Sequence, residues 1–419
     1  MMDSHRDRLP VPAPPRAEMS PWSVLKQSVG KELTRITMPV AFNEPLSFLQ
    51  RITESMEYYP LVVQANNSDD PVARTELVTA FAISTLSSNV NRLTKPFNPL
   101  LGETFELQRE DYRVVCEQVS HHPPVSVLHA QSPHMTFELT ICPKLRCSGT
   151  QIIIKPEGKM TLTLRRHNET YVWSHVNCVV HNILVGKLWF EQQGEMHISC
   201  TQSQLRAVIK FKQAGSDTRD LHRFEGFIID SENQKLRCIY GKWPESVKTC
   251  PPHDVELSPR KTSEGPRKMY AKLNSFTRSL TVGSAHSKDI STEDDFSYPN
   301  SRILWEPQTR PVHSTDFYNL TLFAMSLNEL PDDEEARRRL PCTDCRFRPD
   351  IRRLEEGDLD GAAEEKSRLE ELQRERTKSF KKEGKEWTPL WFREDGDGSW
   401  NFTGDYWKKD FSSVPEIFR

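Results

Sequence analysis

Two adjacent histidines stand on a stiff corner of the chain. His121 and His122 lie in the stretch EQVSHHPPVS, and Pro123 and Pro124 follow them directly. Proline fixes its own φ and keeps the preceding residue extended. Neighbouring side chains of an extended chain point to opposite faces, which disfavours a shared metal ion. Two interpretations remain: imidazoles that donate hydrogen bonds to an anion, which would raise their pKa, or histidines that only end strands in a buried turn.

A second segment, TKPFNPLLGE, places a cation on a stiffened loop. Lys95 and Asn98 stand next to Pro96 and Pro99, and Gly102 permits a tight turn after them. An ammonium group and a carboxamide are hydrogen-bond donors that can bind a phosphate or carboxylate. The segment therefore favours the anion interpretation of the histidine corner.

A charged stretch that begins near Ile351 predicts a long helix with many pairs four residues apart. Lys366, Glu370 and Arg374 recur at this spacing, so their side chains share nearly one face. One interpretation is a solvated ladder of salt bridges. The other places Lys366 and Arg374 on a phosphate, with Glu370 holding one of the cations in position.

Motifs for metal binding or nucleophilic catalysis are incomplete or missing from the sequence. Cys342 and Cys345 in CTDC have no second pair downstream, whereas structural zinc needs four ligands. The segment DGDGSWN copies the start of a calcium loop, but Trp400 stands where that loop needs glycine. No GxSxG, GxxxxGK[ST] or HExxH is present. We therefore expect no metal, no cofactor and no enzyme, with His121 as a general base the one catalytic alternative.

Composition indicates a globular protein of the cytoplasm. The 419 residues are 36% hydrophobic and 27% charged, and the formal net charge is -3, which argues against nucleic-acid binding. No stretch is long and apolar enough for a membrane-spanning helix, and the first residues lack the apolar core of a signal peptide. Nine cysteines, an odd number scattered along a long chain, indicate reduced thiols.

The pattern in residues 46–255 changes from helical to strand-like. Asp70 and Pro71 form a helix start signal. Short alternating runs follow, from TFELQ at 104–108 to KLRCIYGKW at 235–243, with Gly, Pro and Asn between them. So many strands predict a large antiparallel sheet, which curls into a barrel because a barrel leaves few edges. The middle of a wide barrel must hold side chains or a ligand.

Other segments flank this body. Residues 1–20 are polar and rich in proline, which predicts a disordered tail. Residues 256–301 are rich in Ser and Thr without a period and predict a disordered insertion, while residues 302–419 predict a C-terminal subdomain. In residues 21–45, apolar residues recur every three or four positions and indicate either a core-packed helix or a hinged lid: Trp22, Leu25, Val29, Leu33 and Ile36.

The block EQVSHHPP resembles the signature of the oxysterol-binding protein family. Further blocks appear in the order of that family's lipid-binding domain: MPVAFNEPLSFLQR, KPFNPLLGETFE, HNILVGKLWFEQ, GKW, TDCRFRPD and EEKSRLEELQRER. The resemblance spans about residues 22–419. It implies a β-rich α+β fold, with a large incomplete antiparallel β-barrel around a lipid tunnel, an N-terminal lid over the mouth, and helices before and after the barrel.

The same resemblance implies that the tunnel holds a sterol or, in exchange, a phosphatidylinositol phosphate. The headgroup contacts carried over by motif are Lys95, Phe97, Asn98, His121, His122, Lys366, Glu370 and Arg374. We therefore expect a lipid transfer protein that associates transiently with organelle membranes. The alternative is a sensor that reports its bound sterol or phosphoinositide to a protein partner.

Two features of the family's larger members are not expected in this sequence. Those members place a membrane-targeting domain before the lipid-binding domain, and the present chain is too short for one. Many also carry an acidic motif with two phenylalanines for docking to the endoplasmic reticulum, whereas the nearest segment, EDDFSYPN, lacks the paired aromatics. Both departures favour a diffusing shuttle over a stable tether.

Overall fold

The computed structural model describes residues 5–14, 39–148, 150–183, 188–215, 221–257, 297–396 and 398–419. The α-helices are α2 (Phe48–Thr53), α3 (Tyr59–Asn67), α4 (Pro71–Ser84), α5 (Pro252–Leu257), α6 (Leu322–Ser326), α7 (Glu334–Arg338), α8 (Pro349–Glu355) and α9 (Leu359–Lys382). The 3-10 helices are η3 (Val40–Phe42), η4 (Glu54–Met56), η5 (Ser87–Asn89), η7 (Ser314–Asp316), η8 (Cys345–Phe347) and η9 (Asp405–Lys408).

The strands divide into one large sheet and two small ones. The small sheets are the parallel pair β1 (Asn43–Ser47) and β2 (Lys95–Phe97), and the hairpin β16 (Phe392–Glu394) and β17 (Trp400–Phe402). The large sheet contains β3 (Thr104–Gln108), β4 (Arg113–His121), β5 (Pro124–Gln131), β6 (Met135–Ser148), β7 (Gln151–Leu164), β8 (Glu169–Trp173), β9 (Asn177–His181), β10 (Trp189–Cys200), β11 (Arg206–Phe211), β12 (Arg223–Ile229), β13 (Lys235–Lys242), β14 (Ser246–Cys250) and β15 (Arg302–Trp305).

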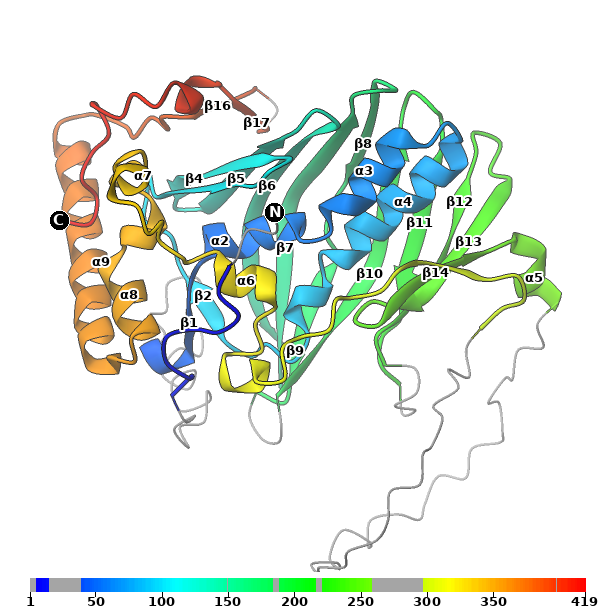
Figure 1. The fold of residues 1–419 in the computed structure, drawn as a ribbon, viewed down its shortest axis with the longest axis horizontal. Coiled ribbons are helices and arrows are strands. Elements are labelled where there is room, and N and C mark those ends of the chain that lie inside the picture. The colour runs from blue at the N-terminus through cyan, green and yellow to red at the C-terminus, as the bar shows by residue number, and fades with distance from the viewer. Residues whose placement is uncertain are drawn as a thin grey trace, which may run out of the picture.

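The large sheet forms most of the molecule and curves around its interior (Figure 1). Its strand order is β15-β14-β13-β12-β11-β10-β8-β7-β6-β5-β4-β3, and β9 pairs with both β10 and β7. Most neighbours along the chain are therefore neighbours in the sheet, as short connections require. Among the described residues, the end strands β3 and β15 do not pair with each other, so the sheet curls without closing. The predicted incomplete antiparallel barrel is confirmed.

Helices α2, α3 and α4 lie across the curved sheet (Figure 1). Helix α4 begins where the sequence predicted, because the Asp70 side chain accepts a hydrogen bond from Val72 N–H at 2.9 Å. The ring of Phe81 in α4 meets Phe137 and Trp173 of the sheet edge-on, with centroid distances of 5.7 and 6.5 Å. Part of the barrel interior is therefore filled by helix side chains.

Residues 5–14 correct the prediction of a disordered tail. The Arg6 guanidinium donates to the Glu355 carboxylate at 2.5 Å, and Leu9 is buried. The Ala13 N–H donates to a main-chain carbonyl of the body at 2.7 Å. The polar, proline-rich composition predicted disorder because composition takes no account of tertiary partners, and here a buried leucine and a paired arginine fix the segment. We call residues 5–14 the N-terminal strap.

Two other predicted segments fall partly or wholly beyond the described residues. Of the insertion predicted at 256–301, the structure describes both ends, and the Tyr298 ring lies edge-on against Tyr240 with centroids 4.7 Å apart. The last residues of that segment therefore belong to the folded body, contrary to the prediction. Outside the described residues lie the apolar positions of the predicted lid: Trp22, Leu25, Val29, Leu33 and Ile36.

The C-terminal part of the chain covers the outer face of the sheet. Trp391, Phe392 and Tyr406 pack with Val115 and Val119 in one buried cluster. The predicted charged helix is present but divided into α8 and α9, because a glycine with φ +87° ends the first helix. Within the described part of the chain, no helix is long and apolar enough to cross a membrane.

Candidate ligand-binding site

Three segments that are distant in sequence meet at the histidine corner. His121 ends strand β4, α9 passes beside it, and the loop that follows β2 approaches both. Gln373 of α9 links them, since its Nε2 donates to Nε2 of His121 at 2.6 Å and its Oε1 accepts from the N–H of Leu101 at 2.7 Å. The three predicted stretches therefore belong to one site.

The face of α9 toward this site carries the predicted row of charges. Lys366 and Glu370 form an ion pair at 3.1 Å in which the Lys366 side chain is only 12% exposed. Arg374 lies 3.5 Å from Glu370 and 2.6 Å from Glu371, and its side chain is largely exposed. Lys366 is therefore enclosed by the site, whereas Arg374 stands at its edge.

Lys95 lies close enough to the α9 row to respond to its charges. Although part of its surface reaches solvent, the protein around the Lys95 ammonium group lowers its pKa by desolvation, and the charge of Lys366 lowers it further. Glu370 acts in the opposite direction. Two ammonium groups that repel each other are suited to an anion, because an anion relieves the repulsion.

The histidine corner is the turn of the β4–β5 hairpin. His121 pairs with Pro124, which leaves His122 and Pro123 as a two-residue turn with a cis peptide bond between them. The two imidazole rings lie edge to face with centroids 4.6 Å apart. The pair therefore occupies a fixed corner, as the prolines predicted.

Burial sets the protonation state of His121 in the absence of a ligand. Burial lowers the pKa of His121 to about 4, and His122 contributes in the same direction. The Pro99 carbonyl oxygen and the Glu370 carboxylate act the other way but do not compensate. An imidazolium pair with raised pKa was expected for an occupied anion site, whereas in this structure His121 is neutral at pH 7.

A buried arginine holds the loop after β2 in place. The Arg348 guanidinium, 2% exposed, donates to the Asn98 carbonyl oxygen at 2.8 Å and to the Glu103 carboxylate at 2.7 Å. Gly102 adopts φ +79°, and a side chain there would collide with the Trp387 ring, so glycine is required for both reasons. The loop conformation is thus fixed before any ligand binds.

Not every predicted contact presents its side chain to the site. The Phe97 side chain is fully buried in a cluster with Val40 and Ile351, so it supports the site from behind. Asn98 is exposed, and its main-chain carbonyl oxygen accepts a hydrogen bond from Arg348. Lys95, His121, His122, Lys366 and Glu370 are the predicted residues that the structure brings together, and we call these five the polar cluster.

Gln373 is the residue of this site that sequence reasoning missed. It lies seven positions after Lys366 and three after Glu370, so it occupies the same face of α9. That spacing was a usable signal. A neutral glutamine was overlooked because attention to an anion site selects for charged side chains.

A cavity of about 990 Å³ lies against the segment that leads into Lys95. Thr94, which directly precedes Lys95, is one of its lining residues, as are Trp189, Phe190 and Trp243. Pro14 and Ala41 also line this cavity, and they stand on either side of residues 15–38 in the chain. The described end of the predicted lid segment, residues 21–45, therefore contributes Ala41 to the wall of this cavity.

Solved structures with similar folds contain lipids. The Osh1 ORD domain in complex with cholesterol is 34% identical, with a TM-score of 0.80 over 97% of this chain and 92% of that one. The Osh3 ORD of Saccharomyces cerevisiae in complex with PI(4)P is 31% identical, with a TM-score of 0.78 over 99% of both chains. The fold is thus that of these domains.

Sequence comparison gives the family. Oxysterol-binding protein-related protein 1 of Rattus norvegicus is 42% identical over 99% of this chain, which spans 44% of that relative's length. Oxysterol-binding protein-related protein 2 of Homo sapiens is 43% identical over 100% of this chain and 88% of its own length. The family model for oxysterol-binding protein matches residues 20–411. The chain belongs to the oxysterol-binding protein family.

Proposed function

We propose that the protein carries a sterol in the 990 Å³ cavity and exchanges it for a phosphoinositide, whose headgroup binds the polar cluster. The observation that carries this proposal is the repulsion between two ammonium groups, Lys95 and Lys366, the first of which directly follows the cavity-lining residue Thr94. A phosphoinositide needs both parts, an anion site for its phosphates and an apolar space for its acyl chains. A sterol needs only the apolar space.

The relatives support both ligands. Solved structures of similar domains hold cholesterol in one case and PI(4)P in another. One cavity that serves either lipid makes the two compete, so each displaces the other at a membrane. Net transport of sterol then follows a gradient of phosphoinositide, and no bond is made or broken.

Burial of the sterol supplies the driving force for extraction. Enclosing a few hundred Å² of apolar surface at ~25 cal/mol per Å² stabilises the complex by on the order of 10 kcal/mol. That gain offsets the loss of contacts in the bilayer. Entry and exit then require a lid at the rim, for which the predicted lid segment 21–45 is the candidate, because its residue Ala41 lines the cavity.

Lipid transfer between two vesicle populations tests the proposal. One population carries labelled sterol, and the other carries phosphatidylinositol 4-phosphate or a neutral lipid in its place. We expect phosphoinositide in the acceptor to accelerate sterol transfer by the native protein and to have no effect with the double variant His121→Ala, His122→Ala. Sterol binding by that variant should persist.

Two results would contradict the exchange mechanism. If sterol bound but was released to neither population, the protein would be a sensor that holds its lipid. If the double variant lost sterol and phosphoinositide binding equally, together with a lowered melting temperature, the histidine corner would be a structural turn only.

A further inference from the structure

Neither nitrogen of His121 is free to meet a ligand in this structure. Nε2 accepts the hydrogen bond from Gln373 Nε2 at 2.6 Å. Nδ1 is buried without a well-formed hydrogen bond among the described residues, and the Pro99 carbonyl oxygen favours protonation of the ring. A headgroup therefore cannot hydrogen-bond to His121 until the contact with Gln373 is broken.

The same contact defines which nitrogen carries the proton. Gln373 Oε1 accepts from the Leu101 N–H at 2.7 Å, so the amide nitrogen of Gln373 must face His121. An amide nitrogen donates only, so it requires the lone pair of His121 Nε2. The neutral ring therefore carries its proton on Nδ1. A donor that occupies the lone pair also opposes protonation of the ring.

The charges around His121 do not force this state by themselves. His122 on the hairpin and Arg348, which lies before α8, oppose protonation, while Glu370 on α9 favours it. Lys95 and Lys366 belong to the same cluster and add positive charge. An incoming phosphate would reverse this balance, because its negative charge stabilises an imidazolium.

We propose that Gln373 is a positioning residue that keeps His121 neutral, with its Nε2 occupied, until a headgroup binds. Phosphoinositide binding exchanges the Gln373–His121 hydrogen bond for one between His121 and a phosphate oxygen. In this exchange Nε2 takes a proton from solvent and keeps it, and the resulting N–H donates a hydrogen bond to the phosphate. The inference rests on the proposed function, since it describes how the same headgroup engages the polar cluster.

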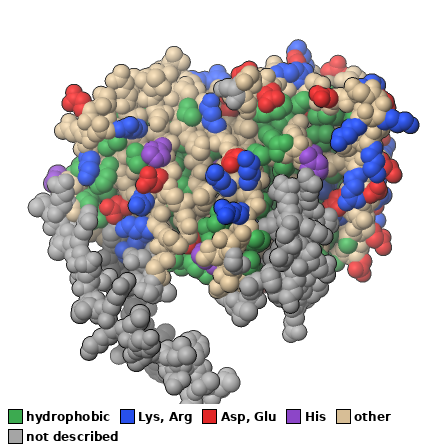
Figure 2. Space-filling view, turned by 180° about the vertical axis from the view of Figure 1, so that it is seen from behind, with side chains coloured by type: hydrophobic (Ala, Val, Ile, Leu, Met, Phe, Trp, Pro, Cys, Tyr) green, Lys and Arg blue, Asp and Glu red, His purple; other side chains and the backbone are tan. Residues whose placement is uncertain are grey.

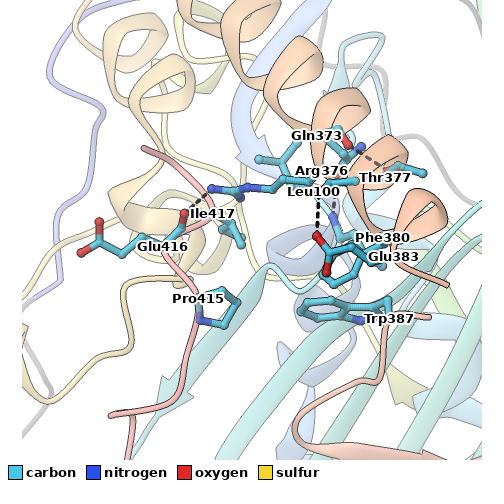
Figure 3. A pocket seen from close by; sticks show the side chains of 12 residues that line it. Leu100, Gln373, Arg376, Thr377, Phe380, Glu383, Trp387, Pro415, Glu416 and Ile417 are labelled. Carbon is cyan, nitrogen blue, oxygen red and sulfur yellow. Dashed lines mark hydrogen bonds between the residues drawn. The ribbon is translucent and has the colours of Figure 1, made fainter. Parts of the chain in front are cut away.

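The structure provides space for the released amide. A cavity of about 350 Å³ lies beside Gln373, and Figure 3 shows its walls, formed by α9 with Leu100, Trp387 and Ile417. Gln373 is itself one of the lining residues. Its side chain can therefore turn into this cavity without displacing a packed neighbour.

Nuclear magnetic resonance of the imidazole nitrogens tests the first half of this proposal without any lipid. In the native protein, the ¹⁵N shifts of His121 should show the Nδ1–H tautomer at pH 7. In Gln373→Met, which keeps the side-chain length and removes both hydrogen bonds, the tautomer preference should weaken and the pKa of His121 should rise by about one unit. Thr377→Val, which alters the same cavity one turn farther along α9, should leave His121 unchanged.

Addition of short-chain phosphatidylinositol 4-phosphate tests the second half. His121 of the native protein should become an imidazolium on binding, so affinity should rise as pH falls from 7.5 to 5.5. The ratio of native to Gln373→Met affinities, which cancels titration of the lipid phosphate, should increase by about 1.3-fold over that range, because the free-state pKa values of about 4 and about 5 both lie below it.

Distinct outcomes separate this inference from the proposed function. An Nε2–H tautomer in the native protein, or a His121 that stays neutral in a complex that does form, would overturn the role of Gln373 and leave phosphoinositide binding intact. A native protein that shows the Nδ1–H tautomer yet binds no phosphoinositide would overturn the proposed function, and with it the exchange step.

Discussion

The polar cluster holds its cations under mutual repulsion. Lys366 is nearly enclosed and shares Glu370 with Arg374, so one carboxylate serves two cations. The lowered pKa of Lys95 follows from desolvation and from the positive charge of Lys366. A phosphate beside these side chains would relieve the repulsion between the two lysines through charge-assisted hydrogen bonds.

Removal of one of these cations should weaken phosphoinositide binding selectively. For Lys366→Met we expect a loss of about tenfold to a hundredfold in affinity for phosphoinositide vesicles, which is the contribution of one charged hydrogen bond. Sterol binding should change little. Lys378→Met is the matched control, since this lysine is exposed on the same helix. Equal losses in both variants would mean that only net charge matters.

The neutral state of His121 predicts a specific loss of stability in acid. The pKa is about 4 in the folded protein and about 6.5 in the unfolded chain, so between these values the unfolded chain binds more protons and stability falls as pH falls. Near pH 5 one such histidine contributes about 1.2 kcal/mol of unfolding free energy per pH unit.

Denaturant unfolding of His121→Gln from pH 7 to pH 4.5 measures this contribution. The variant should show a shallower decline by about that slope, because it lacks the group that titrates. His175, whose pKa burial also lowers to about 4, remains in both proteins and cancels in the comparison. Parallel declines would show that His121 takes up its proton in the folded state as readily as in the unfolded chain.

At the scale of elements, the site depends on contacts that hold separate segments against the barrel. Arg348 holds the loop after β2 through the Asn98 carbonyl oxygen, and Gln373 holds it through the Leu101 N–H. The N-terminal strap performs a similar role at the cavity rim, where Pro14 is one of the lining residues. Its anchor is Arg6, which also donates to the Met325 carbonyl oxygen at 2.7 Å.

Loss of that anchor should release the strap while the barrel stays folded. In Arg6→Ala, amide exchange at Ala13, which donates to Asp316, should accelerate, and bound sterol should leave the cavity faster. The melting temperature should fall by no more than a few degrees. Arg8→Ala is the control, because the Arg8 side chain is 60% exposed. Unchanged sterol release in Arg6→Ala would show that the strap does not influence the rim.

At the scale of the whole molecule, no single sign of charge dominates the surface. On the face shown in Figure 2, basic and acidic side chains are interspersed, in keeping with a formal net charge of -3. Contact with an anionic membrane therefore depends on local features, and the pair of cations Lys95 and Lys366 is one of them.

The long insertion should be dispensable for transfer. Both of its flanks are attached to the body, since Asn300 donates to Asp254 at 3.2 Å and Tyr298 packs on Tyr240. Replacement of residues 258–296 by a short Gly/Ser linker should leave the melting temperature and the vesicle transfer rate unchanged. A slower transfer with an unchanged melting temperature would assign the insertion a role at the membrane.

The sequence by itself determined the alternation that makes the sheet, the start of α4 at Asp70, and the three stretches that carry the polar cluster. These are local properties: period, capping and spacing depend on neighbours in the chain. The tertiary structure alone decided that the strap is docked, that the Phe97 side chain faces the core, and that Gln373 reaches His121. Each of these depends on a partner more than fifty residues away or on burial by other segments, and composition and spacing contain no information about such partners.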